Sequence, residues 1–290
     1  MTPKDNDSQG FHARPRGYNE AMHLIAAAQM VSTGDKANNL EAATRLVRQA
    51  ASLGARLVGL PENFSWMGSE PERPSAAESL EGPTLSRMAE LARERRITLL
   101  AGSVLETGAP GGRLYNTSVL FGPDGARLAV YRKMHLFDVD VGDGATYQES
   151  AAVAPGTEVV AAQTEVGKLG LSVCYDLRFP ELYRRLTSQE GATLLAVPAA
   201  FTLMTGKDHW EVLLRARAIE NQCYVFAPAQ GGRHSDKRIT YGHAMVIDPW
   251  GLVTARASEG EGLALAPVDP ELQARIRRNL PCLQHRRLVE

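Results

Sequence analysis

Short apolar strands alternate with amphipathic helices along most of this chain, and that alternation limits it to a few architectures. Residues 24–29 are predicted to form a strand, and residues 40–53 a helix that buries one face and ends at Gly54. Residues 55–61 form the next predicted strand, and a second helix follows over residues 84–96. This order predicts an α/β fold in which helices pack on sheets.

Later apolar runs are joined by both tight turns and helices. Residues 122–125 are typical of a hairpin turn, and residues 248–251 of a second turn. A helix over residues 208–221 would begin at Asp208 as the N-cap, with Glu211 completing a pair that resembles a capping box. Because hairpins and crossover helices both occur, we expect mixed sheets. The other predicted strands cover residues 99–104, 117–121, 127–132, 168–173, 193–197, 223–227, 243–247 and 262–267.

Size and composition fit one enzyme domain. The chain has 290 residues, of which 44% are hydrophobic, so we expect a single domain over residues 21–290. Residues 1–20 mix Pro, Gly, Asp, Asn and Arg without an apolar stretch, which predicts a mobile tail rather than a signal peptide.

Charge and cysteine usage argue against several classes of protein. The net charge of −1 gives no support for binding to nucleic acid or to a membrane, and no apolar run approaches the length of a membrane span. The three cysteines form no Cys-x-x-Cys pair, and the seven histidines show no metal-ligand spacing. We therefore expect a cytoplasmic protein that needs no disulfide, metal or organic cofactor.

Cys174 lies where an apolar strand ends and a helix is expected to begin. Residues 168–173 form the strand, and Pro180 suits the first turn of a helix because the N–H that it lacks would be unpaired there. Unpaired backbone N–H groups and a helix dipole would favour the thiolate form of Cys174. Cys174 is therefore a candidate nucleophile, although most lone cysteines are small buried hydrophobic residues.

Two more reactive groups stand at strand exits. Glu62 follows the strand over residues 55–61, and Lys133 follows the strand over residues 127–132. In open α/β sheets, ligands bind at the carboxyl ends of the strands. A thiol, a carboxylate and an amine are thus predicted to share one site, whereas a lone Glu or Lys is more often a solvated surface charge.

Three segments around these residues resemble the signature segments of the nitrilase superfamily of carbon–nitrogen hydrolases. They are Leu60-Pro61-Glu62-Asn63-Phe64, Tyr131-Arg132-Lys133-Met134-His135-Leu136 and Val173-Cys174-Tyr175-Asp176-Leu177-Arg178-Phe179-Pro180-Glu181. The resemblance covers nearly everything from residue 24 to residue 288. It implies a four-layer α-β-β-α sandwich with two mixed sheets, an architecture that periodicity alone does not show.

The resemblance also implies amide hydrolysis. Cys174 would attack the amide carbon, Glu62 would act as general base and then acid, and Lys133 would stabilise the oxyanion. The backbone N–H of Tyr175 would be a second oxyanion donor. Glu149 matches a fourth acidic position, which would hold the Lys133 ammonium or position the substrate; without the resemblance it would be taken as a surface carboxylate.

Arginines are candidates to bind a substrate carboxylate. Arg178 follows the thiol by four residues, although an ion pair with Asp176 or Glu181 would explain it equally well. A small-molecule substrate with carboxylates at both ends would need several cationic partners. The available residues are Arg178, Arg215, Arg217 and Arg233.

Two stretches in the second half resemble one branch of the superfamily. Residues 205–251 and residues 277–287 are more similar to enzymes that cleave deaminated glutathione than to omega-amidases, which cleave 2-oxoglutaramate. The resemblance further implies a homodimer or a larger homo-oligomer, with residues 180–186 and the carboxy-terminal segment at the interface. An inactive α/β scaffold that only binds a ligand is the alternative from another class, and the thiol, acid and lysine together count against it.

Overall fold

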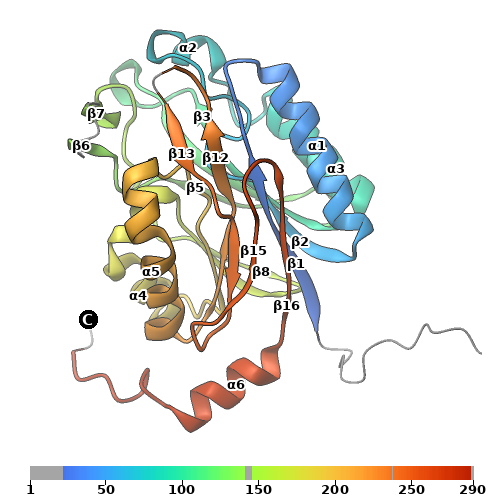
Figure 1. Cartoon of the computed structure of the whole chain (residues 1–290), viewed down its shortest axis with the longest axis vertical. Coiled ribbons are helices and arrows are strands. Elements are labelled where there is room, and N and C mark those ends of the chain that lie inside the picture. The colour runs from blue at the N-terminus through green and yellow to red at the C-terminus, as the bar shows by residue number, and fades with distance from the viewer. Residues whose placement is uncertain (1–21, 141–145, 237, 289–290) are drawn as a thin grey trace, which may run out of the picture.

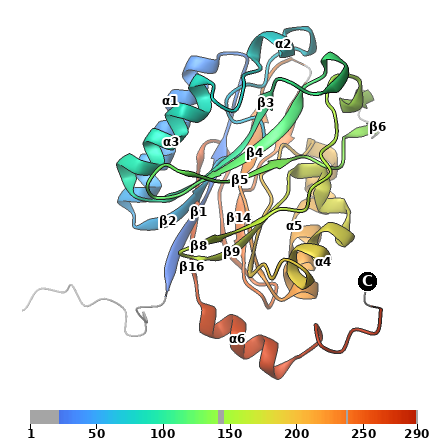
Figure 2. The ribbon, with the colours of Figure 1, turned by 180° about the vertical axis from the view of Figure 1, so that it is seen from behind.

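The structure is a computed structural model that describes residues 22–140, 146–236 and 238–288, so the expected tail over residues 1–20 lies outside it. Over the described residues, the strands form an eight-stranded sheet, a six-stranded sheet and a two-stranded hairpin. The two large sheets lie face to face, with helices on the outer side of each (Figure 1, Figure 2). The expected four-layer α-β-β-α sandwich is confirmed.

The eight-stranded sheet is mixed. Its strands are β1 (His23–Met30), β2 (Ala55–Gly59), β3 (Thr98–Glu106), β4 (Tyr115–Phe121), β5 (Arg127–Arg132), β12 (Ala229–Arg233), β13 (Ile239–Tyr241) and β16 (Gly262–Val268). They run in the order β13-β12-β1-β2-β3-β4-β5, and β16 also pairs with β1. The pairs β12–β1, β1–β2 and β2–β3 are parallel, whereas the others are antiparallel.

The six-stranded sheet is mixed as well. It contains β8 (Ala161–Thr164), β9 (Gly167–Leu171), β10 (Leu194–Ala196), β11 (Tyr224–Ala227), β14 (Met245–Ile247) and β15 (Val253–Arg256), in the order β15-β14-β11-β10-β9-β8. Only its central strands, β9, β10 and β11, are parallel to one another. The separate hairpin pairs β6 (Asp138–Asp140) with β7 (Thr146–Gln148).

Helices cover the outer face of each sheet. The helices α1 (Lys36–Ser52) and α3 (Pro83–Arg95) pack on the eight-stranded sheet, and α4 (Pro180–Ser188) and α5 (Leu203–Asn221) pack on the six-stranded sheet. The short helix α2 (Arg73–Ala76) lies near the β6–β7 end, and α6 (Pro270–Asn279) extends below the layers in Figure 1. None of the helices in the described residues is long and apolar enough to cross a membrane.

Strand β1 shows how the layers form. Its side chains alternate between the two faces of the sheet. Ile25 and Ala27 belong to the core between the sheets, whereas Ala26, Ala28 and Met30 belong to the core under α1 and α3. All five are buried, which explains why β1 reads as a continuous apolar run rather than an alternating one.

The start of α5 differs from the sequence prediction. The helix begins at Leu203 with Thr202 as its N-cap, five residues before the expected start at Asp208. Leu203 and Met204 are about half exposed, so no buried periodicity marks this first turn. Gly206 does not interrupt the helix, because its N–H bonds to the Thr202 carbonyl at 2.8 Å.

Candidate active site

Glu62 reaches the site because β2 leaves the sheet in close contact with β3. The exit from β2 passes directly over Gly102, where an added Cβ would lie only 1.8 Å from the carbonyl oxygen of Leu60. Asn63, the next residue after Glu62, adopts a φ of +55° and donates its N–H to the Ser103 hydroxyl at 3.0 Å. This strained turn directs the Glu62 side chain into the space beyond the strand ends.

Cys174 comes from the opposite sheet. It follows β9 and begins the 3-10 helix Cys174–Arg178, after which α4 starts at Pro180 as the sequence predicts. The φ of Cys174 is +51°, a left-handed conformation that is uncommon for a residue with a Cβ. A hydrogen bond from its N–H to the Pro198 carbonyl, 2.9 Å long, fixes this turn.

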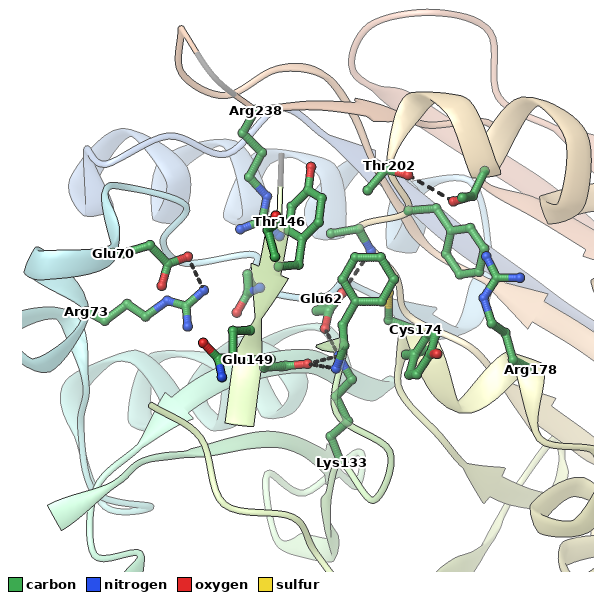
Figure 3. A pocket seen from close by; sticks show the side chains of 18 residues that line it. Glu62, Glu70, Arg73, Lys133, Thr146, Glu149, Cys174, Arg178, Thr202 and Arg238 are labelled. Atoms are coloured by element: carbon green, nitrogen blue, oxygen red, sulfur yellow. Dashed lines mark hydrogen bonds and ion pairs between the residues drawn. The ribbon is translucent and has the colours of Figure 1, made fainter. Parts of the chain in front are cut away.

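Lys133 lies between two carboxylates. Its Nζ is 3.0 Å from Glu62 Oε1 and 2.8 Å from Glu149 Oε2. The Lys133 and Glu62 side chains are only 2% and 4% exposed. Figure 3 shows both ion pairs beside the Cys174 side chain, so the structure brings together the four residues that the sequence selected.

Backbone and amide donors hold the two carboxylates. Asn116 Nδ2 donates to Glu62 at 2.9 Å and to Glu149 at 3.2 Å. The N–H of Ala200 donates to Glu62 at 3.0 Å, and the N–H of Phe137 donates to Glu149 at 2.8 Å. Asn116 was not predicted from the sequence, because it lies at the beginning of β4 rather than at the exit of a strand.

The charges in this centre stabilise one another. Burial alone would lower the pKa of Lys133, but the negative charges of Glu149 and Glu62 outweigh it and raise that pKa above its usual value. Burial opposes ionisation of Glu149, but the Lys133 charge and the Lys133 and Phe137 hydrogen bonds lower the pKa of its carboxyl group. Lys133 is therefore an ammonium at neutral pH, and Glu149 a carboxylate.

The thiol of Cys174 behaves differently from the sequence prediction. Burial and the negative charge of Glu62 raise its pKa well above the ordinary value, although Lys133 acts in the other direction. The expectation that the strand-to-helix turn favours a thiolate is therefore wrong for the resting protein. The thiol is protonated at neutral pH and needs a base before it can attack.

A buried carboxylate joins the lysine segment to the cysteine segment. Asp176 is fully buried and accepts hydrogen bonds from the Tyr131 hydroxyl at 2.7 Å and from the backbone N–H of His135 at 3.0 Å. Tyr131 and His135 stand two residues before and after Lys133, and Asp176 stands two residues after Cys174. Asp176 thereby ties the two reactive segments together.

The reactive groups open into a cavity of about 260 Å³. Tyr175 and Arg178 line it, as expected for residues that contact a substrate. Arg178 forms no ion pair with Asp176 or Glu181, and its guanidinium lies 3.3 Å from His209 Nδ1. The alternative role predicted for Arg178, an ion pair with Asp176 or Glu181, is therefore contradicted.

The other three arginines expected at the substrate lie elsewhere. Arg217 is buried against the Leu177 carbonyl, Arg215 bonds to the Gly251 carbonyl, and Arg233 is exposed. The sequence does not show where these side chains point, so it could not separate them from Arg178. Two arginines that it missed, Arg73 and Arg238, line the cavity instead. Arg238 belongs to the charged stretch 233–238, whereas nothing in the sequence marks Arg73.

Metal ligands do not gather in this region. Over residues 22–140, 146–236 and 238–288, no group of three or more His, Cys, Asp or Glu side chains is arranged to hold a metal ion. The available chemistry is that of an acid–base carboxylate, a buried ammonium and a thiol.

Known proteins are similar to this chain in sequence. A sequence model of the carbon-nitrogen hydrolase family matches residues 24–278. A Synechocystis protein named deaminated glutathione amidase is 50% identical over 92% of this chain and 99% of its own length. The mouse protein omega-amidase NIT2 is 40% identical over 91% of this chain and 94% of its own length.

The same relationship appears in three dimensions. The crystal structure of the Caenorhabditis elegans NitFhit protein matches with a TM-score of 0.86 and 41% identity, over 92% of this chain and 65% of that one. With the family match over most of its length, the chain belongs to the carbon-nitrogen hydrolase family and is a hydrolase of amide C–N bonds.

Proposed function

We propose that the chain hydrolyses deaminated glutathione to 2-oxoglutarate and cysteinylglycine through a thioester on Cys174. The observation that carries the reaction type is the meeting of Glu62, Lys133 and Cys174 at one cavity. The choice of substrate is supported by the 50% identity to the Synechocystis protein of that name.

Glu62 is the proton carrier in this mechanism. It removes the proton from the Cys174 thiol as the sulfur attacks the amide carbon, and it then protonates the departing amine of cysteinylglycine. A water molecule, deprotonated by Glu62, next attacks the thioester and releases 2-oxoglutarate and the free thiol. The raised pKa of Cys174 makes this base necessary, because little thiolate exists without it.

Lys133 is the main oxyanion donor. The carbonyl oxygen becomes negative when the sulfur adds, and a permanently charged ammonium nearby stabilises that charge. The backbone N–H of Tyr175 is suited to be the second donor, because the first N–H groups of a helix have no partner within it. Glu149 keeps Lys133 charged and oriented without contacting the scissile bond.

Omega-amidase activity on 2-oxoglutaramate is the second candidate. The mouse omega-amidase is 40% identical to this chain, and both substrates share the 2-oxo acid that would form the thioester. We expect 2-oxoglutaramate to react more slowly, because it lacks the remote contacts of the dipeptide.

The deciding experiment measures kcat/KM for the two substrates with the same enzyme preparation. The Cys174→Ala variant serves as the blank. A higher value for deaminated glutathione supports the proposal, and a clear preference for 2-oxoglutaramate replaces it with omega-amidase activity. If neither compound is turned over, the chain hydrolyses an amide other than these two.

The proposal extends to assembly and location. It places the chain in the cytoplasm as one domain over residues 21–290 that forms a homodimer or a larger assembly of dimers. The interface would contain α4 and the carboxy-terminal segment, where Leu288 is 95% exposed. A two-fold contact is the commonest arrangement of this kind. Light scattering at micromolar concentration tests it, and a single species of 31.5 kDa would contradict it.

A further inference from the structure

Arg73 and Arg238 bring two positive charges to the lining of the cavity. Arg73 starts α2, and its side chain is 15% exposed and pairs at 2.6 Å with Glu70, which is itself 70% exposed. Arg238 precedes β13, and no carboxylate of the described residues lies within ion-pair distance of its guanidinium. Among the described residues, Arg73 thus pairs with one exposed carboxylate and Arg238 with none.

The two guanidiniums are close enough to affect one another. Burial lowers the pKa of Arg73, and the positive charge of Arg238 lowers it further. The negative charges of Glu70, Glu149 and Glu62 act in the other direction. Both arginines also line a smaller cavity next to Glu149. Like charges that are partly removed from water are costly, and an anion between them would offset the cost.

These arginines and Arg178 lie on opposite sides of the reactive groups. Figure 3 shows Arg73 and Arg238 on one side of Glu62, Lys133 and Cys174, and Arg178 on the other. All of these residues line the same cavity. A substrate whose amide carbon lies at the thiol would therefore extend toward a cation in both directions.

We propose that Arg73 and Arg238 form a carboxylate-binding subsite, so that the enzyme selects amides that carry a carboxylate on each side of the scissile bond. Guanidinium groups bind carboxylates in a bidentate, planar manner. This inference rests on the proposed function, because it needs an amide cleaved between the two ends.

A thermodynamic cycle on the substrate tests the subsite. Wild type and Arg238→Gln are compared on deaminated glutathione and on two analogues, one with the glycine carboxylate esterified and one with the 2-oxo acid carboxylate esterified. Loss of a charge-assisted hydrogen bond should lower kcat/KM for the parent substrate about 10- to 100-fold, mainly through KM. The same substitution should lower it less than about threefold for the one analogue that lacks the recognised carboxylate.

The cycle also identifies which carboxylate is bound. If Arg238→Gln has little effect on the glycine ester, the subsite binds the carboxylate of the leaving dipeptide. If it has little effect on the 2-oxo acid ester, the subsite binds the carboxylate of the acyl part. Equal losses on all three compounds, or no loss, would overturn the proposal. Arg73→Gln should behave like Arg238→Gln, and Arg238→Lys should recover part of the activity. Arg233→Gln is the matched control, because this exposed arginine of the same segment does not line the cavity.

A binding measurement separates this inference from the proposed substrate. In the Cys174→Ala background, calorimetry follows binding of 2-oxoglutarate and of cysteinylglycine with and without Arg238→Gln. Weaker binding of one of them in the Arg238→Gln variant supports the subsite even if the wild type proves to cleave a different amide. Unchanged affinity for both products overturns the subsite even if deaminated glutathione is hydrolysed.

Discussion

The reactive centre and the rim of the cavity are built in different ways. In the centre, Lys133 is buried between Glu62 and Glu149 and forms an ion pair with each of them. On the rim, Arg73 pairs with the exposed Glu70, and Arg238 forms no ion pair with a carboxylate of the described residues. The centre stands at the ends of sheet strands, whereas the rim comes from α2 and from the segment before β13.

This difference separates chemistry from selectivity. Buried groups that are paired with one another hold one geometry and serve every substrate in the same way. Partly exposed cations gain a counter-charge only when a ligand binds, so they distinguish one substrate from another. Changes in the centre should therefore lower kcat for all substrates, and changes on the rim should raise KM for charged substrates.

The largest effect is expected at Cys174. Cys174→Ala should lower kcat by about 10⁴-fold or more, because no other group can form the thioester. Thermal unfolding should show that the fold is retained. Cys223→Ala is the matched control, since Cys223 is also buried but lies against the Ala192 carbonyl and does not line the cavity. Substantial turnover by purified Cys174→Ala would end the covalent mechanism.

Glu62→Gln should lower kcat about 10³-fold, because the base that removes the thiol proton is lost. The same change removes a negative charge that raises the pKa of Cys174 and leaves the Lys133 ammonium in place. The pH at which iodoacetamide alkylates Cys174 at half its maximal rate should therefore fall while turnover disappears. An unchanged or higher alkylation midpoint would show that Glu62 does not control the thiol.

Asp176→Asn tests whether the centre depends on its link between the two segments. The amide would face the Tyr131 and His135 donors with only one acceptor oxygen, so Lys133 and Cys174 should shift relative to each other. We expect kcat to fall about 10- to 100-fold with KM nearly unchanged. The exposed Asp208 provides the matched control as Asp208→Asn. A change in KM alone would place Asp176 with the rim instead.

Arg178→Gln should show the opposite kinetic pattern. Arg178 lines the cavity and contacts His209 rather than a carboxylate, so its charge is available to a substrate. KM should rise about tenfold for a dicarboxylate substrate, with kcat little changed. If kcat falls as much for a neutral amide as for the charged one, Arg178 acts on the chemistry and the proposed division between centre and rim fails.

The smallest effect concerns acid stability of the rim. Burial lowers the pKa of His234 to about 4, and its ring nitrogens contact the Ser32 carbonyl and the Thr240 hydroxyl. Because the folded pKa lies below the unfolded value of 6.5, stability from neutral His234 is complete above pH 6.5. It should fall by about 1–3 kcal/mol as the pH drops toward 4.

Denaturation at pH 7 and pH 4 measures this loss, with His234→Asn as the comparison. The variant should show a smaller difference between the two pH values than the wild type. The N–H of His234 also bonds to the Arg238 carbonyl, so the loss concerns the segment that carries one of the rim arginines. An equal pH dependence in both proteins would show that protonation of His234 does not cause the loss of stability.

Three residues of the centre could be predicted from local sequence signals, whereas Glu149 was predicted only from the family resemblance. Glu62, Lys133 and Cys174 follow apolar runs that end abruptly, and the ends of such strands meet at one edge of the sheets. Asn116 has no such signal, and its role depends on where β4 places it. The pKa of Cys174 was predicted in the wrong direction, because burial and the approach of Glu62 are tertiary effects.

The fold could be predicted where burial is periodic. Residues 127–132 are the strand β5 as expected, and the predicted inner face of α1 is buried at Ala43, Leu46 and Val47. The strands β12 and β13 were missed, since β12 contains two glycines and β13 has only three residues. The rim arginines were missed because α2 has only four residues and Arg238 lies just before β13, so no period reveals where either side chain points.

The central claim is that the buried centre acts through a thioester on Cys174, whatever the rim selects. The most direct measurement is mass spectrometry of enzyme that is acid-quenched during turnover of deaminated glutathione or 2-oxoglutaramate. The account predicts a mass increase equal to the 2-oxoglutaryl group, located on the peptide that contains Cys174 and absent from Cys174→Ala. The contradicting result is an enzyme preparation that turns over at its full rate but shows no adduct on that peptide. The samples for this comparison are quenched before the first catalytic cycle is complete.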